Sequence, residues 1–305
     1  MAKQKINPVL VIVAFTTVYL VWGSTYFFIQ VAVKDFPPLI MGSIRFIAAG
    51  SLLLAWCIIR GEARLSWGQM KTAVITGLML LLIGNGAVII SEQWLPSSLV
   101  AVLISSVPFW FIVLDVRGWK DNLRKRSVIS GLVSGFIGVT LMFGEKVLKA
   151  VTSAGFGNEM TGLVILLIGT MSWAGGSLYS KYSSSGSSFL NSAWQMLVAG
   201  IAFLICSLFT KEWRVFHWGS VPALSWFSIG YLVIFGSVAA YSAYVWLLRV
   251  RTAAQVSTYA YVNPVIAVLL GVFIAGEHMS VVQICGLVTI LVSVLMINLT
   301  KYRRS

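Results

Sequence analysis

The chain runs Met41-Gly42-Ser43-Ile44-Arg45-Phe46-Ile47-Ala48-Ala49-Gly50 through the middle of an apolar segment that extends from about Leu39 to Ile59. A segment of this length crosses a bilayer as an α-helix. Arg45 is the only lysine or arginine placed well inside any such segment. Because arginine keeps its charge, hydrocarbon is a costly environment for it. Two interpretations stay open: Arg45 faces a polar cavity, or it is a structural residue that reaches the headgroups or a neighbouring carbonyl.

Composition places the whole chain in a membrane. Of 305 residues, 58% are hydrophobic and 10% are charged, and the mean hydropathy is +0.91. Soluble proteins carry about 25% charged residues. Lysine and arginine outnumber aspartate and glutamate by 22 to 9, but they cluster in the short links between apolar segments, which indicates membrane topology rather than a nucleic-acid partner. The three cysteines fall in three different apolar segments without disulfide or metal spacing, and no cofactor is expected.

Hydropathy divides the chain into ten segments, and lipid leaves the backbone no alternative to the helix. We therefore predict an all-α integral membrane protein with ten transmembrane helices. Their ranges are about 9–31, 39–59, 72–91, 97–117, 127–143, 162–180, 188–210, 223–248, 254–275 and 281–299. Apart from Arg45, sixteen lysines and arginines lie on the same side of the membrane as the N-terminus, and five lie on the opposite side. The positive-inside rule then predicts that both termini are cytoplasmic.

The two halves of the chain repeat each other. Four matches lie at offsets of 151, 150, 156 and 155 residues: Trp22-Gly23 with Trp173-Ala174, Arg45 to Gly50 with Gln195 to Gly200, Pro108 with Pro264, and Gly131 with Gly286. Each half holds five segments, an odd number, so the second half enters the membrane from the opposite side. We predict two inverted five-helix repeats, 9–143 and 162–299, joined by an outward-facing linker, 144–161. Such repeats are typical of secondary transporters with a site at the midplane.

The ordered set of motifs resembles a known family. The motifs are Trp22-Gly23-Ser24-Thr25-Tyr26, Arg45-Phe46 with Ala49-Gly50, Pro108, and Tyr259-Ala260-Tyr261-Val262-Asn263-Pro264 followed by Gly276-Glu277. The chain resembles the EamA-type members of the drug/metabolite transporter superfamily, and within them the YedA-like branch. The resemblance implies ten helices in two inverted repeats, alternating access, and often export of amino acids, metabolites or toxic compounds. It does not fix the substrate.

Polar and aromatic residues inside the segments are candidates for a cavity lining. Thr16, Tyr19, Gly23, Tyr26 and Gln30 share one helical face, which favours a cavity lining over plain helix packing. The substrate-binding candidates are Trp22, Tyr26, Arg45, Asn85, Trp173, Gln195, Tyr241, Tyr244, Tyr259 and Asn263.

Glu92 lies at the outer end of the third segment, one heptad after Asn85. A solvated position is one interpretation. The other makes Glu92 the protein partner of Arg45 and the candidate for proton coupling. Pro108 and Pro264 are predicted helix breaks that free the carbonyls of residues 104 and 260 near the binding region.

A cavity rich in tryptophan and tyrosine, with one buried cation and no deep acid, suits a small amphipathic molecule with a negative or zwitterionic end. We expect export of small metabolites such as amino acids. Broad drug efflux is the alternative, and a membrane-embedded enzyme or scramblase fits less well, because the chain has no metal spacing, phosphate loop or paired acids in the membrane. Gly131, Gly135 and Gly138 form a small-residue face for helix contact, either within the protomer or at the seam of a homodimer.

Overall fold

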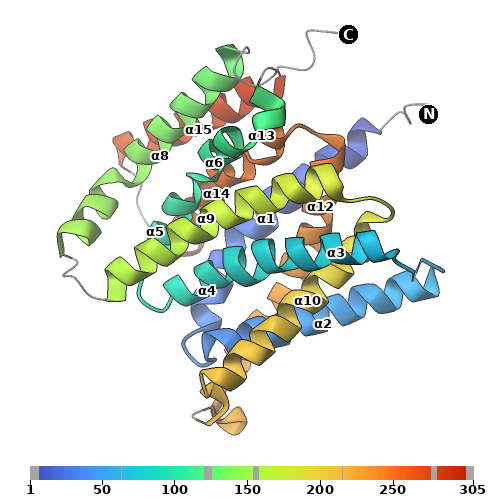
Figure 1. Ribbon diagram of the computed structural model, residues 1–305. Helices are drawn as coiled ribbons and strands as arrows, with labels where there is room; N and C mark the ends of the chain where they lie inside the picture. The colour runs from blue at the N-terminus through green and yellow to red at the C-terminus, as the bar shows by residue number, and fades with distance from the viewer. Residues whose placement is uncertain are drawn as a thin grey trace.

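The computed structural model describes residues 7–62, 64–95, 97–119, 126–153, 158–214, 216–275 and 280–299, and these residues are helical apart from turns and short links (Figure 1). In chain order the helices are α1 (Pro8–Ala32), α2 (Pro38–Ile59), α3 (Trp67–Thr76), η1 (Gly77–Asn85), α4 (Gly86–Ser91), α5 (Ser97–Ile104), α6 (Val107–Leu114), η2 (Val116–Gly118), α8 (Arg126–Ser153), α9 (Asn158–Ser183), α10 (Ser188–Phe209), η3 (Glu212–Arg214), η4 (Trp218–Ser220), α11 (Ala223–Tyr231), η5 (Leu232–Tyr241), α12 (Ser242–Val250), α13 (Ala253–Val256), α14 (Tyr259–Ala275) and α15 (Val281–Leu299).

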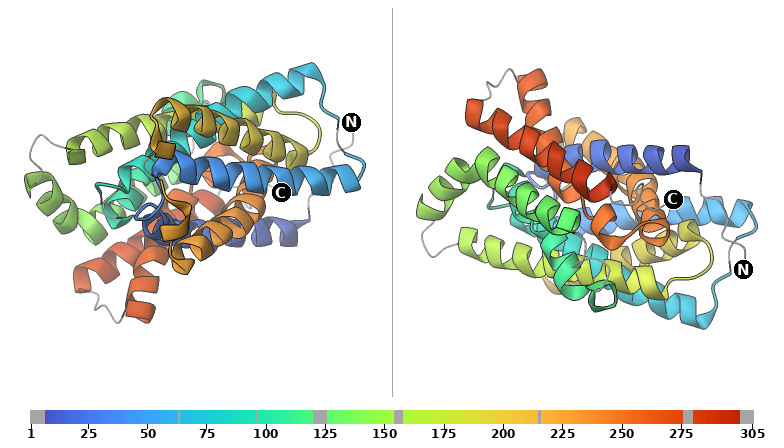
Figure 2. Two further views of the ribbon diagram at one scale, coloured as in Figure 1. Left: turned by 90° about the horizontal axis from the view of Figure 1, so that it is seen from below. Right: turned by 90° about the horizontal axis from the view of Figure 1, so that it is seen from above.

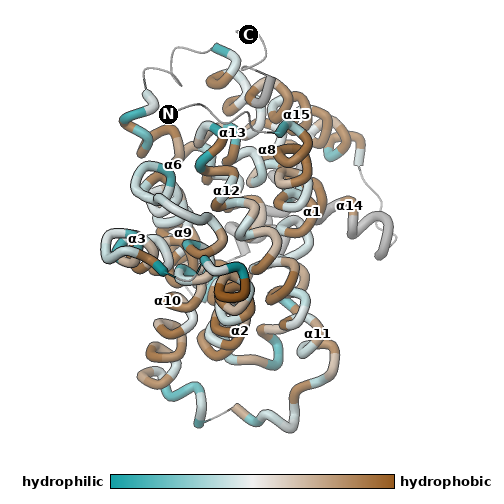
Figure 3. The backbone as a smooth tube through the Cα atoms, turned by 90° about the vertical axis from the view of Figure 1, so that its right-hand side faces the viewer, coloured by the Kyte–Doolittle hydropathy of each residue, from teal (hydrophilic) through white to brown (hydrophobic). Residues whose placement is uncertain are grey.

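Each of the ten predicted segments corresponds to a helix or a run of consecutive helices. Among the described residues, six helical stretches are long and apolar enough to cross a membrane: Pro8–Ala32, Pro38–Ile59, Trp67–Ser91, Asn158–Ser183, Ser188–Phe209 and Ala223–Val250. Three shorter apolar helices cover Leu99–Leu114, Arg126–Leu141 and Val281–Ile297. Apolar residues predominate along the helices, and hydrophilic ones gather near their ends (Figure 3). The crossing of the bilayer by all ten segments stays a prediction.

Several predicted boundaries differ from the structure: α3 begins at Trp67 rather than at residue 72, α9 begins at Asn158 rather than at residue 162, and α8 ends later than predicted. The linker was expected to begin at residue 144, but α8 continues as a helix to Ser153. The charged residues Glu145, Lys146 and Lys149 end the apolar run. They do not end the helix, because glutamate and lysine are good helix formers.

The third stretch of each half contains a π-helical part at the same place in the repeat. These parts are η1 and η5, whose first residues, Gly77 and Leu232, are 155 positions apart. A π-helix shifts the hydrogen bonds from i+4 to i+5, costs stability, and is frequent at functional sites. Hydropathy periodicity does not indicate this feature, so the sequence analysis did not predict it.

Reciprocal contacts relate the two halves by a pseudo-two-fold axis. A Cβ added at Gly50 of α2 would lie 2.8 Å from Leu197 Cγ of α10, and one added at Gly200 of α10 would lie 2.7 Å from Ile47 Cγ1 of α2. Gly50 and Gly200 are equivalent residues of the two repeats, 150 positions apart, and so are Ile47 and Leu197. Each contact is therefore the repeat equivalent of the other. Equivalent helices therefore pack against each other in antiparallel orientation, which is the geometry that an inverted repeat requires.

The last helices of the two halves, α8 and α15, show the same exchange. Gly131 approaches the carbonyl of Ser293, and Gly138 approaches the carbonyl of Gly286; the offset here is 155 residues. The face formed by Gly131, Gly135 and Gly138 thus packs within the protomer. A homodimer would have to use another surface.

The first helix of each half packs against the third and fourth stretches of the other half. Helix α1 contacts α11, η5 and α14, and helix α9 contacts η1, α4 and α6. The end of α2 and the start of α3 lie at one end of the molecule, and the facing ends of α8 and α9 lie at the opposite end (Figure 2). Because each first helix packs against the other half, residues of α1 and α9 come together in the interior.

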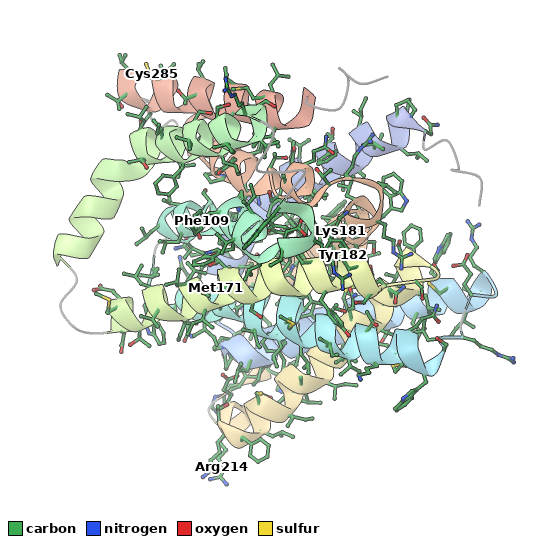
Figure 4. All side chains as sticks on the ribbon, turned by 45° about the horizontal axis from the view of Figure 1, so that its top comes forward. Phe109, Met171, Lys181, Tyr182, Arg214 and Cys285 are labelled. Atoms are coloured by element: carbon green, nitrogen blue, oxygen red, sulfur yellow. The ribbon has the colours of Figure 1, made fainter. Side chains whose placement is uncertain are left out.

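The C-terminal turn of α9 is held by hydrogen bonds to two other elements. Lys181 Nζ donates to the carbonyls of Leu248 and Arg251 at 2.7 and 2.5 Å, and the Tyr182 hydroxyl donates to Asp115 Oδ1 at 2.6 Å. Lys181 and Tyr182 are marked at this end of α9 in Figure 4. The two bonds from Lys181 satisfy carbonyl groups at the C-terminal end of α12, which the end of a helix leaves open.

A helix break lies beside the first of the two predicted prolines: α5 and α6 meet at Ser105–Ser106, and Pro108 is in the first turn of α6. The prediction of a break at Pro264 is wrong, because Pro264 lies inside the continuous helix α14, and the break between α13 and α14 comes earlier, at Ser257–Thr258. The Ser105 hydroxyl donates to the carbonyl of Ala260 at 3.0 Å. That carbonyl is the one that Pro264 leaves without its helical partner. A polar side chain at the break between α5 and α6 therefore satisfies the carbonyl that Pro264 leaves open.

Glu212, outside the membrane segments, caps the start of α2. Its Oε2 accepts from the backbone N–H of Ile40 at 3.0 Å, and its Oε1 accepts from that of Leu39 at 3.4 Å. Burial raises the pKa of the Glu212 carboxyl above its ordinary 4.5, and these N–H donors oppose that rise only in part.

A pH dependence of stability follows from this raised pKa. Because the folded state binds the Glu212 proton more tightly than the unfolded state, acidification through the folded-state pKa stabilises the fold, and the gain is complete below the unfolded value. We expect the thermal midpoint of the wild type to rise relative to Glu212→Gln as the pH is lowered from 7 toward about 4.5. Melting curves of both proteins across this range test it, and a constant difference would contradict it.

Candidate functional site

Four aromatic side chains from α1, α9, α12 and α14 form one cluster in the interior. The ring centroid of Trp22 lies 5.5 Å from that of Trp173, 4.9 Å from Tyr244 and 4.9 Å from Tyr259. Trp22 and Trp173 occupy equivalent places in the two repeats, and their rings meet edge to face. Because tryptophan and tyrosine combine large apolar faces with a polar edge, the cluster is suited to hold an amphipathic molecule.

Hydrogen bonds fix the orientation of this cluster. Trp22 Nε1 donates to the carbonyl of Gly236 at 3.1 Å, within π-helical η5. Trp173 Nε1 donates to the Tyr244 hydroxyl at 3.0 Å, and that oxygen lies 2.6 Å from Ser177 Oγ. The rings are therefore held in defined positions.

Arg45 lies at the junction of α2 with both π-helical parts. Its Nε donates to Ser237 Oγ of η5 at 2.9 Å, and its Nη1 donates to Asn85 Oδ1 of η1 at 3.2 Å. The side chain is only 3% exposed, and its guanidinium carbon lies 4.9 Å from the Phe46 ring centroid. The side chain thus lies in the interior and does not reach the headgroups. Both hydrogen-bond partners are neutral, so no anion among the described residues is in contact with this charge.

Gln195 occupies the equivalent place in the second repeat and is fully buried. Its Nε2 donates to Thr76 Oγ1 at 2.8 Å, and its Oε1 accepts from the Tyr241 hydroxyl at 2.7 Å. Thus Arg45 and Gln195 each make one bond within their own repeat, to Asn85 and Tyr241, and one bond to the other repeat. The two side chains keep equivalent positions, but Arg45 is charged and Gln195 is neutral.

A cavity lies between Arg45 and the aromatic cluster. Six of the predicted binding residues line it: Trp22, Tyr26, Arg45, Asn85, Trp173 and Tyr259. The other four do not line it. Tyr241 and Tyr244 contact the ring of Trp173, Gln195 is bonded to Tyr241, and Asn263 lies beside Tyr26. The cavity has the apolar walls and the few polar groups of a small-molecule site.

Sequence reasoning missed several residues of this site. Thr25 and Thr170 line the cavity, as do the close-packed glycines Gly84 and Gly169, and Ser237 holds Arg45. Thr25 follows the Trp22-Gly23-Ser24 motif and is offset by one residue from the polar stripe, which is a signal that could have found it. A single serine in the apolar run of η5 carries no comparable signal.

Glu92 directly follows α4 and is 4% exposed, so the solvated interpretation is wrong. Both of its carboxylate oxygens lack a hydrogen bond to any described residue. It attracts Arg45 electrostatically but does not contact it; the partners of Arg45 are Asn85 and Ser237. The expected Arg45–Glu92 pair is therefore not formed, because the side chain of Asn85 on the same helical stretch lies closer to the guanidinium. A hollow on the Glu92 side of the cavity is lined by Gln30, Val33, Lys34, Glu92, Gln93, Trp94 and Leu95.

Fold and site together define a helical membrane protein with two interlocked repeats and a central cavity. The family model of the EamA-like transporter family matches the chain twice, over residues 9–144 and 160–299. The chain belongs to the EamA-like transporter family, which confirms the resemblance inferred from its motifs. Of those motifs, Gly276-Glu277 lies outside the described residues.

Individual relatives agree with this assignment. The inner membrane transporter YedA of Escherichia coli (strain K12) is 35% identical over 95% of this chain and 90% of its own length. The transporter YoaV of Bacillus subtilis (strain 168) is 24% identical over 96% of this chain and 98% of its own. A solved crystal structure with 16% sequence identity superposes with a TM-score of 0.76 over 98% of this chain and all of the other, which shows the shared fold.

Proposed function

We propose that this protein is a secondary transporter of the inner membrane that exports small metabolites, amino acids first among them, by alternating access. The observation that carries the proposal is Arg45, a buried cation with two neutral partners at the wall of a cavity lined by aromatic rings. A guanidinium binds a carboxylate through two parallel hydrogen bonds, and the aromatic walls supply apolar contact. The inverted relation of the repeats supports alternating access, because exchange of the two halves converts an outward-open site into an inward-open one.

Broad efflux of toxic compounds is the second candidate. It is favoured by the size of the aromatic surface, which accepts varied apolar molecules. A transporter specialised for cationic drugs would be expected to place a carboxylate deep in the cavity, whereas the residues that line this cavity include Arg45 and no acid, and Glu92 lines the neighbouring hollow. We propose that all ten segments span the membrane, and that both termini are cytoplasmic, from the distribution of lysine and arginine in the links.

Two measurements separate these candidates. Cells that overproduce the protein are exposed to toxic amino-acid analogues and, in parallel, to cationic dyes. We expect resistance to the analogues, and efflux of the matching amino acid from proteoliposomes down its own gradient. Cells that produce Arg45→Ala at the same membrane level serve as the control. Resistance to dyes alone would replace the first candidate by the second.

We propose Glu92 as the residue that couples transport to protons, since proton exchange needs a titrating group on the path. The charged or ionisable groups near it are Arg45 of α2, Tyr26 of α1, and Lys34, which lines the same hollow. Proton movement that accompanies amino-acid efflux would then occur in the wild type and be lost in Glu92→Gln. Equal proton movement in both proteins would exclude Glu92 from coupling.

A further inference from the structure

The described residues contain ten buried side-chain nitrogen or oxygen atoms without a hydrogen-bond partner, and four of them belong to Glu92 and Asn263. Native proteins satisfy nearly all such atoms, so this concentration requires an explanation. Glu92 is 4% exposed and Asn263 is 1% exposed. Both oxygens of Glu92 and the amide oxygen of Asn263 thus lack a donor among the described residues.

Tyr26 connects these two residues. Its hydroxyl lies next to the amide of Asn263, and it experiences the charge of Glu92. Tyr26 is itself part of the cavity lining. A carboxylate, an amide oxygen and a phenol oxygen from three different helical stretches thus gather beside the cavity, and all three can accept hydrogen bonds.

This acceptor-rich group lies apart from the buried cation but along the same wall. Asn85, which is bonded to Arg45, and Glu92 are seven residues apart, which is about 10 Å along a helix. Val88 lies between them and lines the cavity. The cavity and the hollow that Glu92 lines follow each other along two helices: Tyr26 and Val88 line the cavity, and Gln30 and Glu92, four residues further on, line the hollow. Arg45 and Glu92 attract each other across this boundary without forming an ion pair.

We propose that Glu92, Tyr26 and Asn263 form an amine subsite, and that the cavity binds a zwitterionic α-amino acid with its carboxylate on Arg45 and its ammonium on Glu92. A primary ammonium offers three donors to the open acceptors, and each charge of the ligand compensates one buried charge of the protein. The proposal rests on the proposed function as an amino-acid exporter, and it adds which side chains bind the amine of the ligand.

The test uses ligands that share one body and differ only in their charged groups. One set is phenylalanine, 3-phenylpropionate and 2-phenylethylamine; the other is leucine, 4-methylpentanoate and 3-methylbutylamine. Equilibrium binding to the purified full-length protein is measured for each. We expect the amino acid of at least one set to bind about tenfold or more tighter than its matching acid and its matching amine, because each lacks one charge-assisted contact.

Variants locate the amine contact. Glu92→Gln is expected to weaken amino-acid binding about tenfold and to leave the acid unchanged, so that the preference disappears. Glu92→Asp should keep the preference. Glu159→Gln, an exposed glutamate in the first turn of α9, is the matched control and should behave as wild type. If Glu92→Gln does not fold, Asn263→Ala is measured instead. We expect it to weaken amino-acid binding relative to acid binding by a smaller factor.

The outcomes separate this inference from the function on which it rests. Amino-acid binding that stays equally selective in Glu92→Gln, or wild type that binds the acid as tightly as the amino acid, would overturn the amine subsite and leave a carboxylate exporter in place. Absence of binding by every amino acid and acid would contradict the proposed function itself.

Discussion

Arg45→Ala is expected to reduce amino-acid efflux by about tenfold to hundredfold per inserted molecule, whereas Gln195→Ala is expected to reduce it far less. A hydrogen bond with a charged partner contributes about 1.5–3 kcal/mol, against about 0.5–1.5 kcal/mol for a neutral one. Arg45 faces the cavity with a charge that its neutral partners leave uncompensated. Gln195 is already bonded to Thr76 and Tyr241 and does not line the cavity. Its loss therefore acts on packing between the repeats rather than on the ligand.

Initial efflux rates from proteoliposomes, normalised to the amount of inserted protein, measure this difference. Arg45→Lys is the third variant, because lysine keeps the charge but loses the planar fork that binds Ser237 and Asn85. Normal transport by the lysine variant would show that charge alone matters. Equal and mild losses in the two alanine variants would return Arg45 to a structural role.

Gly200→Ala is expected to destabilise the protein by about 1–3 kcal/mol, the usual cost of overpacking a well-packed contact. The added methyl would lie 2.6 Å from the backbone nitrogen of Ile47, which cannot move without shifting α2. Gly50→Ala, at the equivalent position, would meet the backbone nitrogen of Leu197 at 2.9 Å and should lose a similar amount. Because the two contacts are exchanged by the pseudo-two-fold axis, similar losses test that relation as well.

Gly230→Ala is the matched control for these glycines. Gly230 also lies in a helix, α11, but nothing approaches its added Cβ within 4 Å. Alanine there should be neutral or stabilise the helix by up to about 1 kcal/mol. Thermal unfolding of the purified variants in detergent provides the comparison. A Gly200→Ala protein as stable as wild type would mean that α2 and α10 do not pack as closely as the structure has them.

Several features of this protein can be predicted from local sequence. Apolar composition alone requires a helix in lipid, because a backbone without water must satisfy its own hydrogen bonds. We could therefore infer the ten helical stretches without coordinates. The offsets between the repeats, and the equivalent places of Trp22 and Trp173 in them, could also be read from the sequence. Arg45 could be singled out for the same reason: one permanent charge inside an apolar run needs a partner wherever the run packs.

The identity of that partner could not be inferred. Ser237 lies 192 positions from Arg45 in the chain, and its contact depends on the π-helical turn of η5, which rotates the residues after it relative to an α-helix. The sequence by itself thus determined that this chain forms paired membrane helices with a charge that requires a polar interior. Only the tertiary structure decided that Asn85 and Ser237 hold this charge and that Glu92 stays buried and unpaired, because these contacts depend on packing between distant segments rather than on local periodicity.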